Sequence, residues 1–253
     1  MIRLEGIQKY FNRGTVNESH LFRGFNLDIQ DGDFVSVVGS NGSGKTTMLN
    51  ILCGSLPCDG GRILVDGRDV TALPERRAAA IGRVYQDPAM GTVPDMTILE
   101  NLSLAANKGK PYGFTPAVSR RKAGLFRELV ASVGLGLEDR MDIPVGSLSG
   151  GQRQALSLLM STMTPIDLLI LDEWGYVPVD KDGSQLLFRV ISDSYESKSL
   201  ILTTNLEFSK WGGIFTDDQL AAAMIDRLVH HGHLLIIEGK SYRMEHALMR
   251  QDA

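Results

Sequence analysis

The chain has 253 residues and a formal net charge of −4, with hydrophobic and charged contents of 43% and 22%. These values are typical of a globular protein that can bury a sizeable core, as one large α/β domain or two smaller ones, and they provide no overall basic field to attract nucleic acid. No apolar stretch approaches the length of a membrane span, and residues 1–5 do not read as a signal peptide, so we expect any membrane role to come through a partner. The two cysteines, Cys53 and Cys58, are expected to be reduced thiols.

Two segments near the amino terminus, 2–7 and 21–29, alternate apolar and polar residues, which predicts half-exposed strands of an antiparallel element. A polar loop, 12–20, lies between them, and the aromatic pair Tyr10 and Phe11 precedes it. Residues 34–39 then read as a short buried strand.

That strand leads directly into Gly39-Ser-Asn-Gly-Ser-Gly-Lys-Thr46, which fits the phosphate-loop pattern G-x-x-x-x-G-K-[ST] without a mismatch. The glycines of such a loop let backbone N–H groups wrap phosphates, and the positive end of the following helix, predicted over 47–53, points at them. We expect Lys45 to neutralise the β and γ phosphates and the Thr46 hydroxyl to bind Mg²⁺. The expected nucleotide-binding residues here are Gly39, Ser40, Asn41, Gly42, Ser43, Gly44, Lys45, Thr46 and Thr47.

The middle of the chain predicts alternating strands and helices. Glycines bound a strand at 61–67, a short helix follows at 74–80, and a strand at 81–86 ends at Gln86. A mostly helical region over 98–133 is interrupted by a loop at 109–116 that contains glycine and proline. Ser149, Gly150 and Gly151 then precede an apolar-periodic helix predicted over 155–163, which makes a second potential anion site.

Four apolar residues, Leu168 to Leu171, predict a buried parallel strand that ends in the carboxylates Asp172 and Glu173. Ligands of such sheets collect at the carboxyl ends of the strands. Beside a phosphate loop, Asp172 is expected to hold Mg²⁺ and Glu173 to orient or deprotonate an attacking water. The alternative is a core strand followed by a solvated acidic turn.

Beyond this strand we expect a crossover helix at 185–195, a parallel strand at 199–205, a helix at 216–228, and a closing hairpin from 234–237 and 240–244. The cluster of His230, His231 and His233 lies in a predicted turn. A metal cluster is the alternative there, but no acidic or cysteine ligand is spaced to complete it.

Several motifs resemble those of ATP-binding cassette (ABC) ATPases over about residues 1–173. Leu148-Ser-Gly-Gly-Gln152 resembles the signature motif and stands between the phosphate loop and Asp172-Glu173, as in that family. The resemblance implies that Ser149, Gly150, Gly151 and Gln152 contact ATP. It also implies that Gln86 is the Q-loop glutamine, a sensor of Mg²⁺ that couples to membrane subunits. Phe11 resembles the aromatic that stacks on adenine, with Tyr10 as the less favoured choice; a strand-end glutamine and a half-buried core aromatic are the structural alternatives.

This resemblance ends after Glu173. An ABC ATPase continues with a D-loop and a histidine at the end of the next strand, whereas this chain reads Trp174-Gly-Tyr-Val-Pro-Val-Asp180 and has Thr204 in the place of the histidine. The segments 172–180, 203–209 and 223–231 resemble IstB-like ATP-binding proteins, AAA+-type transposition helpers, over about residues 167–253. That resemblance implies that Asn205 positions the hydrolytic water and makes Arg227 a candidate γ-phosphate sensor or inter-subunit arginine. The alternatives are a turn residue and a surface ion pair.

Together these features predict an α/β P-loop NTPase with a three-layer fold: a mainly parallel central sheet, an amino-terminal antiparallel β subdomain and a helical signature-motif subdomain at about 95–160. One ATPase domain is expected over 1–253, its ABC-like part over 1–166 and its IstB-like part over 167–253. The expected cofactors are ATP and Mg²⁺, the metal ligands Thr46, Gln86 and Asp172, and the catalytic residues Glu173, Lys45, Gln86 and Asn205.

Three functional hypotheses follow. The first is a cytoplasmic ABC-type ATPase, peripheral to the membrane, that pairs head to tail with another copy or a partner ATPase and drives transmembrane permease subunits. The second is an ATP-dependent transposition helper that binds DNA and a transposase. The third is a chimera of two P-loop NTPases that binds nucleotide but has an impaired cycle.

Overall fold

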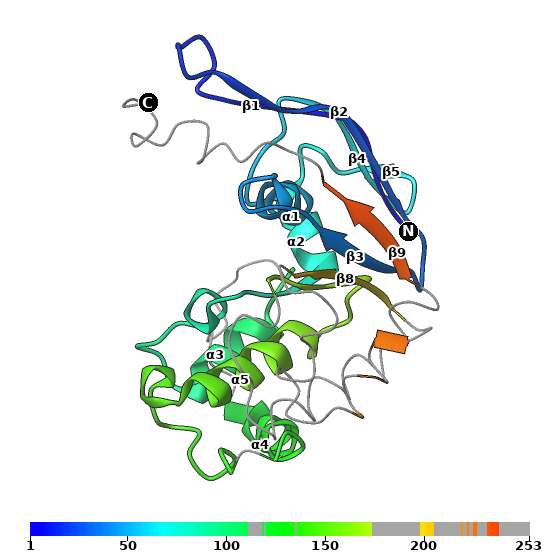
Figure 1. Cartoon of the computed structure of the whole chain (residues 1–253). Helices are drawn as coiled ribbons and strands as arrows, with labels where there is room; N and C mark the ends of the chain where they lie inside the picture. Colours follow the sequence, from blue (N-terminus) through cyan, green and yellow to red (C-terminus); the bar gives the residue numbers. More distant parts are fainter. Residues whose placement is uncertain are drawn as a thin grey trace.

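The computed structural model describes residues 1–110, 118, 120–134, 136–173, 198–204, 219, 222, 225–226 and 232–237. Two sheets and a group of helices make up these parts of the chain (Figure 1). The predicted elements at 185–195 and 240–244 lie outside the described residues, as does most of the predicted helix at 216–228.

The amino-terminal strands form the predicted antiparallel element. The sheet has four strands in the order β2-β1-β4-β5. Their bounds are Ile2–Phe11 for β1, Ser19–Ile29 for β2, Gly60–Val65 for β4 and Arg68–Asp69 for β5. Both β1 and β2 extend further than the alternation indicated, because β1 continues through the aromatic pair and pairs Phe11 with Ser19.

The second sheet is parallel throughout its described pairs and has five strands in the order β6-β7-β8-β3-β9. Their bounds are Phe34–Val38 for β3, Ile81–Val84 for β6, Leu168–Leu171 for β7, Ser199–Thr203 for β8 and Gly232–Ile236 for β9. Every residue of β7 and β8 is buried, as continuous apolar runs in a central parallel strand require. The mainly parallel central sheet is therefore confirmed.

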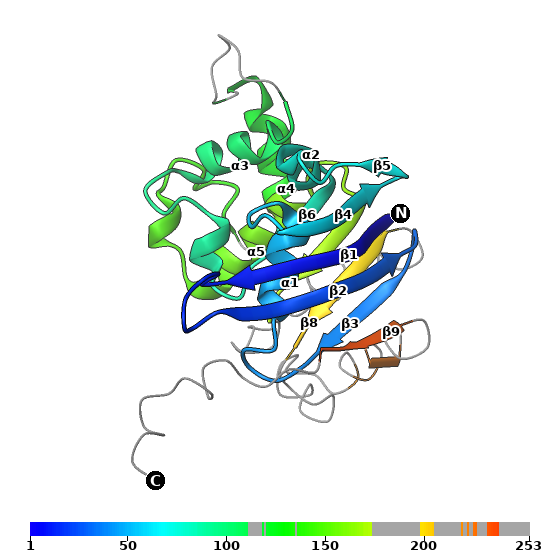
Figure 2. The ribbon, with the colours of Figure 1, turned by 90° about the horizontal axis from the view of Figure 1, so that it is seen from above.

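Helix α1 (Lys45–Cys53) lies between the two sheets, with α2 (Pro74–Ala80) next to it (Figure 1), and Figure 2 shows β1 and β2 crossing over α1. One hydrophobic cluster joins β1, α1 and the parallel sheet, and it includes Leu4, Met48, Leu52, Val37 and Ile170. Because α1 is covered on both sides, its position relative to the preceding loop is fixed by packing from two directions.

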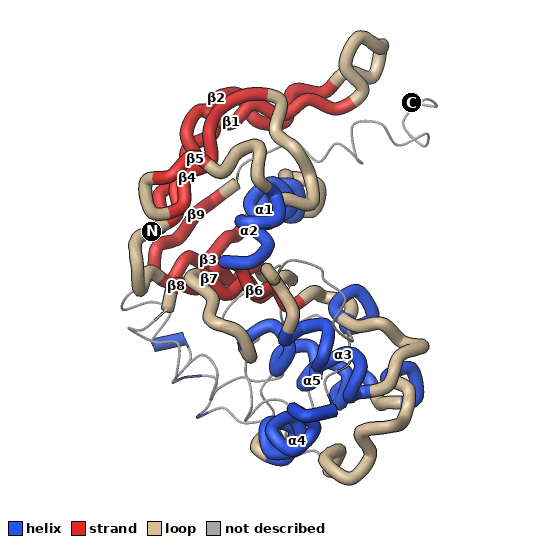
Figure 3. Tube along the Cα trace, turned by 180° about the vertical axis from the view of Figure 1, so that it is seen from behind, coloured by secondary structure: helices blue, strands red, loops and turns tan. Residues whose placement is uncertain are grey.

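The remaining helices gather on the far side of the parallel sheet (Figure 3). They are α3 (Ile98–Ala106), α4 (Ala123–Ala131) and α5 (Gly150–Thr162), with 3₁₀ turns η1 (Pro88–Gly91), η2 (Arg120–Lys122) and η3 (Val145–Ser147). They share a second hydrophobic cluster, centred on Phe126 and including Leu102, Val130 and Leu156. None of the helices in the described part of the chain combines the length and the apolarity needed to cross a bilayer.

Two predicted elements differ from the structure. Helix α5 begins at Gly150 instead of residue 155, because Ser149 caps it and its first turn contains glycines that carry no apolar signal. Strand β9 begins at Gly232 instead of residue 234 and pairs in parallel with β3 at the edge of the sheet, while the second arm of the predicted hairpin, 240–244, lies outside the described residues.

Candidate functional site

Four strands of the parallel sheet have their carboxyl ends side by side, and most of the predicted site residues follow these ends. We call this side of the sheet its carboxyl edge. The loop 39–46 follows β3, Gln86 comes two residues after β6, Asp172 and Glu173 follow β7, and Thr204 follows β8. Since the strands are parallel and adjacent, their carboxyl ends meet there.

The loop 39–46 forms a close-fitting cradle of backbone. A Cβ on Gly39 would lie 2.6 Å from the Ile237 carbonyl oxygen and 2.7 Å from Ser43 Oγ, so a larger residue there would collide with main chain. Gly44 caps α1 with a φ of 108°, a left-handed value suited to glycine. The Ser43 hydroxyl is buried and has no hydrogen-bond partner among the described residues. A loop that presents backbone N–H groups and an unpaired hydroxyl at a helix amino terminus suits an anionic phosphate.

The Lys45 side chain lies within this loop. Its Nζ donates to the carbonyl oxygens of Gly39 at 2.7 Å and Ser40 at 3.1 Å, and the residue is 4% exposed. Burial lowers the pKa of Lys45, while the charges of Glu173 and Asp172 oppose that shift. The ammonium is therefore held near both carboxylates without a direct ion pair to either among the described contacts.

Asp172 is buried and bonded on both oxygens. Thr203 Oγ1 donates to its Oδ1 at 3.0 Å, and Arg83 forms an ion pair with its Oδ2; the two charged side chains are only 5% and 6% exposed. Arg83 also donates to Asn50 Oδ1 at 2.7 Å and stacks on the Tyr85 ring at 4.6 Å. Burial lowers the pKa of Arg83, but the hydrogen bond to Asp172 and the neighbouring charges, that of Asp172 first, together outweigh it, so that pKa is raised overall.

The sequence interpretation missed Arg83. A charged residue in the middle of the apolar strand Ile81–Val84 was the available signal, since buried charges in proteins are paired. Its partner could not be named without knowing that β6 and β7 are neighbours.

Glu173 has a φ of 46°, which is a left-handed backbone conformation that costs a non-glycine residue about 1–2 kcal/mol. Its backbone N–H donates to Thr203 Oγ1 at 2.6 Å, which helps hold that conformation. The same hydroxyl thus fixes both acidic residues. Glu173 is half-buried, so its carboxylate can reach water, and the alternative of a fully solvated acidic turn does not fit Asp172.

The predicted signature residues form the first turn of α5. Ser149 Oγ accepts from the Gln152 N–H at 3.2 Å, and Gln152 Oε1 accepts from the Ser149 N–H at 3.2 Å, which makes a capping box. The pattern S-x-x-Q could have placed the start of the helix from sequence alone. Gly150 is exposed and Gly151 half-exposed, so this amino terminus is accessible to another molecule.

The two candidate aromatics differ in their surroundings. The Tyr10 ring stacks on His20 at 3.9 Å and lies under Arg13, whereas Phe11 is 37% exposed. The phosphate loop lies close to β1 and β2, because a Cβ on Gly44 would be 3.3 Å from the Phe22 ring of β2. Phe22 in turn is paired with Lys9 of β1. Phe11 stands two residues beyond Lys9, about 7 Å along the strand. Of the two rings, Phe11 has the more accessible surface.

The structure describes some of the remaining predicted residues, and others lie outside its described parts. Thr46 and Gln86 are exposed, and Thr204 is buried at 2%. Asn205 and Arg227 lie outside the described residues, as do His230 and His231. His233 is 71% exposed and lies 3.7 Å from Asp33, and within the described part of the chain no three metal-binding side chains gather.

The oxygen atoms at this edge suit Mg²⁺, a hard cation that prefers carboxylates, hydroxyls and water. The Thr46 hydroxyl is accessible and the Asp172 carboxylate lies at the same edge. Each carboxylate oxygen of Asp172 has accepted one hydrogen bond and retains further acceptor capacity.

The model of the family described as "ABC transporter" matches residues 22–175, from β2 through the acidic pair. The chain belongs to the ABC transporter family. It has the P-loop ABC ATPase fold, and it is a P-loop ATPase of the kind that forms the ATPase component of these transporters.

Relatives are similar over most of the chain. A tyrosine transport ATP-binding protein of Clostridioides difficile is 42% identical over 68% of this chain and 69% of its own length. A macrolide export ATP-binding/permease protein of Brucella abortus is 37% identical over 81% of this chain, which spans only 31% of that relative. Among solved structures, a dimeric ATP-binding cassette in a post-hydrolysis state with ADP and phosphate aligns with a TM-score of 0.64 and 27% identity over 81% of this chain and 88% of that one.

A second family model, described as "IstB-like ATP binding protein", matches residues 147–249. It overlaps the ABC match over 147–175, which contains α5, β7 and the acidic pair. Both predicted resemblances are thus present, and they share the acidic strand.

Proposed function

We propose that the chain binds ATP with Mg²⁺ at the loop 39–46 and hydrolyses it with Glu173 as the general base. The observation that carries the proposal is the meeting of Lys45, Asp172 and Glu173 at the carboxyl ends of β3 and β7, which belong to one parallel sheet. A cation for the phosphates and a base for water are the two groups that phosphoryl transfer needs from the protein.

The residues of this chain would divide the work as follows. Lys45 leaves the loop carbonyls that it now contacts and donates to the β and γ phosphates, while backbone N–H groups of the loop donate to the same phosphates. Thr46, Gln86 and Asp172 would hold Mg²⁺, which neutralises phosphate charge when bound. Glu173 takes a proton from the attacking water, and its strained backbone, tied to Thr203, fixes the direction of the carboxylate.

The proposed active unit is a head-to-tail dimer with a second copy or a partner ATPase. The accessible first turn of α5 supports this, since Ser149 and Gly151 can meet the γ-phosphate bound by the other copy. A dimeric cassette among the solved structures, at 27% identity, is consistent with it. We further propose that transmembrane permease subunits are the physiological partners, reached through Gln86 and the helical cluster, so that the chain works at the cytoplasmic face of a membrane.

Phe11 is the proposed adenine platform. It has the exposed ring of the aromatic pair, and base stacking on an aromatic ring contributes about 1–3 kcal/mol. Replacing Phe11 with alanine would test this assignment against Tyr10→Ala, whose ring is already stacked on His20.

Nucleotide binding is tested with Lys45→Ala. Affinity for a fluorescent ATP analogue is expected to fall by about tenfold or more, because a charge-assisted contact to phosphate is lost. Lys198→Met, a lysine outside the site, is the matched control. Unchanged affinity in Lys45→Ala would overturn the proposal.

Dimerisation is tested with Glu173→Gln, which retains the shape of the side chain but removes the base. With ATP and Mg²⁺ this variant is expected to elute as a dimer in size-exclusion chromatography, and the same variant without ATP as a monomer. A monomer under both conditions would contradict the head-to-tail arrangement.

A transposition helper remains the second candidate, because the IstB-like model covers residues 147–249. Such a protein binds DNA through phosphates, so its affinity falls steeply with salt. Salt-sensitive binding of duplex DNA in an ATP-dependent manner would favour that candidate, and its absence alongside ATP-driven dimerisation would favour the transporter ATPase. If the chain is a chimera that only binds nucleotide, it should bind ATP but release no measurable phosphate.

A further inference from the structure

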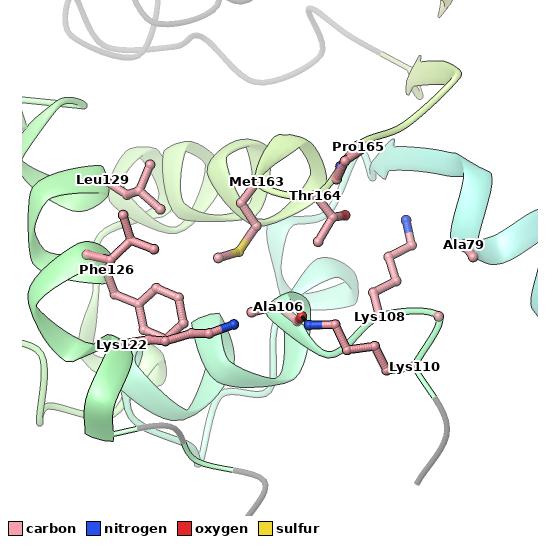
Figure 4. A pocket seen from close by; sticks show the side chains of 12 residues that line it. Ala79, Ala106, Lys108, Lys110, Lys122, Phe126, Leu129, Met163, Thr164 and Pro165 are labelled. Carbon is pink, nitrogen blue, oxygen red and sulfur yellow. Dashed lines mark hydrogen bonds between the residues drawn. The ribbon is translucent and has the colours of Figure 1, made fainter.

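A cavity of about 470 Å³ lies away from the nucleotide site, where α4 and the ends of α3 and α5 meet the parallel sheet (Figure 4). It borders Ala79 at the end of α2, just before β6, and Thr164 and Pro165 just before β7. These residues mark the amino ends of the two strands, whereas the phosphate loop and the acidic pair lie at the carboxyl ends. The cavity is therefore a separate site.

Three lysines border this cavity, and none of the described residues that line it is acidic. Lys108 and Lys110 follow α3, and Lys122 immediately precedes α4, so the cations come from two segments. Figure 4 shows their side chains around one space, with the ammonium groups of Lys110 and Lys122 drawn toward Ala106. Lys110 Nζ donates to the Ala106 carbonyl oxygen, and Lys108 Nζ to that of Ile81. An ammonium has three donors, so both retain hydrogen-bonding capacity for a ligand.

Lys108 and Thr164 add two further polar groups to the wall of the cavity. Burial lowers the pKa of Lys108, which means that the folded chain holds a partly desolvated cation without a carboxylate beside it. The Thr164 hydroxyl is buried and has no hydrogen-bond partner among the described residues.

The rest of the lining is apolar. Phe126, Leu129 and Met163 belong to the helical hydrophobic cluster, and Phe126 is 1% exposed. Leu125, which is 53% exposed, and the half-buried Leu129 and Met163 offer apolar surface that a ligand with a short hydrocarbon body would cover and a free inorganic anion would leave in contact with water. The volume lies within the range of about 300–1,000 Å³ typical of small-molecule sites.

We propose that this cavity binds a small amphipathic carboxylate, with the carboxylate held by Lys110 and Lys122 and the hydrocarbon body packed on Leu125, Leu129 and Met163. Because its walls come from both the helical cluster and the amino ends of β6 and β7, the ligand connects those two parts of the molecule.

The probe for this site is octanoate, measured by isothermal titration calorimetry on the full chain at low salt. Saturable binding with one site is expected, and it should weaken as salt rises because the attraction is partly electrostatic. Octan-1-ol lacks the charge and acetate lacks the body, so each is expected to bind at least about tenfold more weakly, equivalent to 1.4 kcal/mol. Octanol that binds as tightly as octanoate would overturn the proposal, since the lysines would then contribute nothing.

Lys122→Met is the first test variant, and a loss of roughly fivefold in octanoate affinity is expected for one partly solvated ammonium. The double variant Lys110→Met/Lys122→Met should lose more. Lys198→Met carries the same charge change outside the cavity and should bind octanoate like the parent. Equal binding by the double variant and the parent, with unchanged melting temperatures, would refute the assignment of the carboxylate to this cavity.

Discussion

The ion pair between Arg83 and Asp172 is the contact whose removal has the clearest consequence. Replacing Arg83 with methionine keeps much of the side-chain length but removes the charge, and leaves the Asp172 carboxylate buried without its counter-ion. Breaking one side of a buried pair costs about 3–5 kcal/mol, mostly because the remaining charge is uncompensated. The side chains are 5% and 6% exposed, so water cannot take the place of the guanidinium without local opening.

Thermal and urea unfolding measure this cost. In a chain of this size each kcal/mol lowers the melting temperature by roughly 2–4 °C, so a fall of about 6–20 °C is expected. The matched control is Arg62→Met. Arg62 pairs with Glu5, but its side chain is 66% exposed, and a surface pair of that kind contributes about 0–1 kcal/mol.

The double variant Arg83→Met/Asp172→Asn separates pairing from packing. Removing both charges leaves two neutral side chains, so the double variant should be more stable than Arg83→Met alone, with a coupling energy of about 2 kcal/mol or more. If Arg83→Met costs no more than Arg62→Met, or if the double variant is the least stable of the set, the reasoning from buried charge is refuted.

Three further variants probe other parts of the site. Gly39→Ala would place a Cβ 2.6 Å from the Ile237 carbonyl oxygen, and we expect ATP-analogue binding to weaken about tenfold, from roughly 1–3 kcal/mol of overpacking. Asp59→Asn tests the pH dependence of stability. The pKa of Asp59 is lowered, first by the hydrogen bond from the Tyr10 N–H and less by Lys9. The carboxylate therefore stabilises the fold at pH values above its ordinary pKa of 3.8, and this stabilisation is lost as the pH falls through the lowered pKa. The free energies of unfolding of parent and variant, measured in urea, should differ at pH 7 and become equal in acid. The difference at pH 7 should be less than about 1 kcal/mol, because water screens the group. Thr204→His should raise phosphate release if the ABC arrangement continues past β8, and an unaltered rate would show that the following residues impose a different one.

Local pattern was enough to predict the parts of the site that depend on one segment. The loop 39–46 was predicted because its glycines and Lys45 carry the phosphate-loop pattern, and the strand before Asp172 because four apolar residues precede two carboxylates. The strands β1 and β2 were predicted from alternation. Each of these depends on a period or a spacing within a few residues.

What sequence could not give was the order of the strands. Arg83 pairs in register with Ile170, and Asp172 lies two residues beyond Ile170 on the same face of β7, which is how the two charges meet. Nothing near Arg83 in the sequence names that partner. For the same reason the sequence did not indicate that β9 joins the far edge of the sheet beside β3.

The candidate site is a single unit that neither family match covers alone. The ABC match ends at residue 175, and it includes the phosphate loop, Arg83 and the acidic pair but not β8. The IstB-like match begins at residue 147 and contains β8 but not the phosphate loop. Thr203, the last residue of β8, donates to Asp172 and accepts from the Glu173 N–H, and β8 itself is buried between β7 and β3. The Asp172 carboxylate and the Glu173 backbone, beside an ABC-type phosphate loop, are therefore both held by a hydroxyl supplied from beyond the ABC match, so residues after Glu173 take part in setting the geometry of the proposed catalytic site.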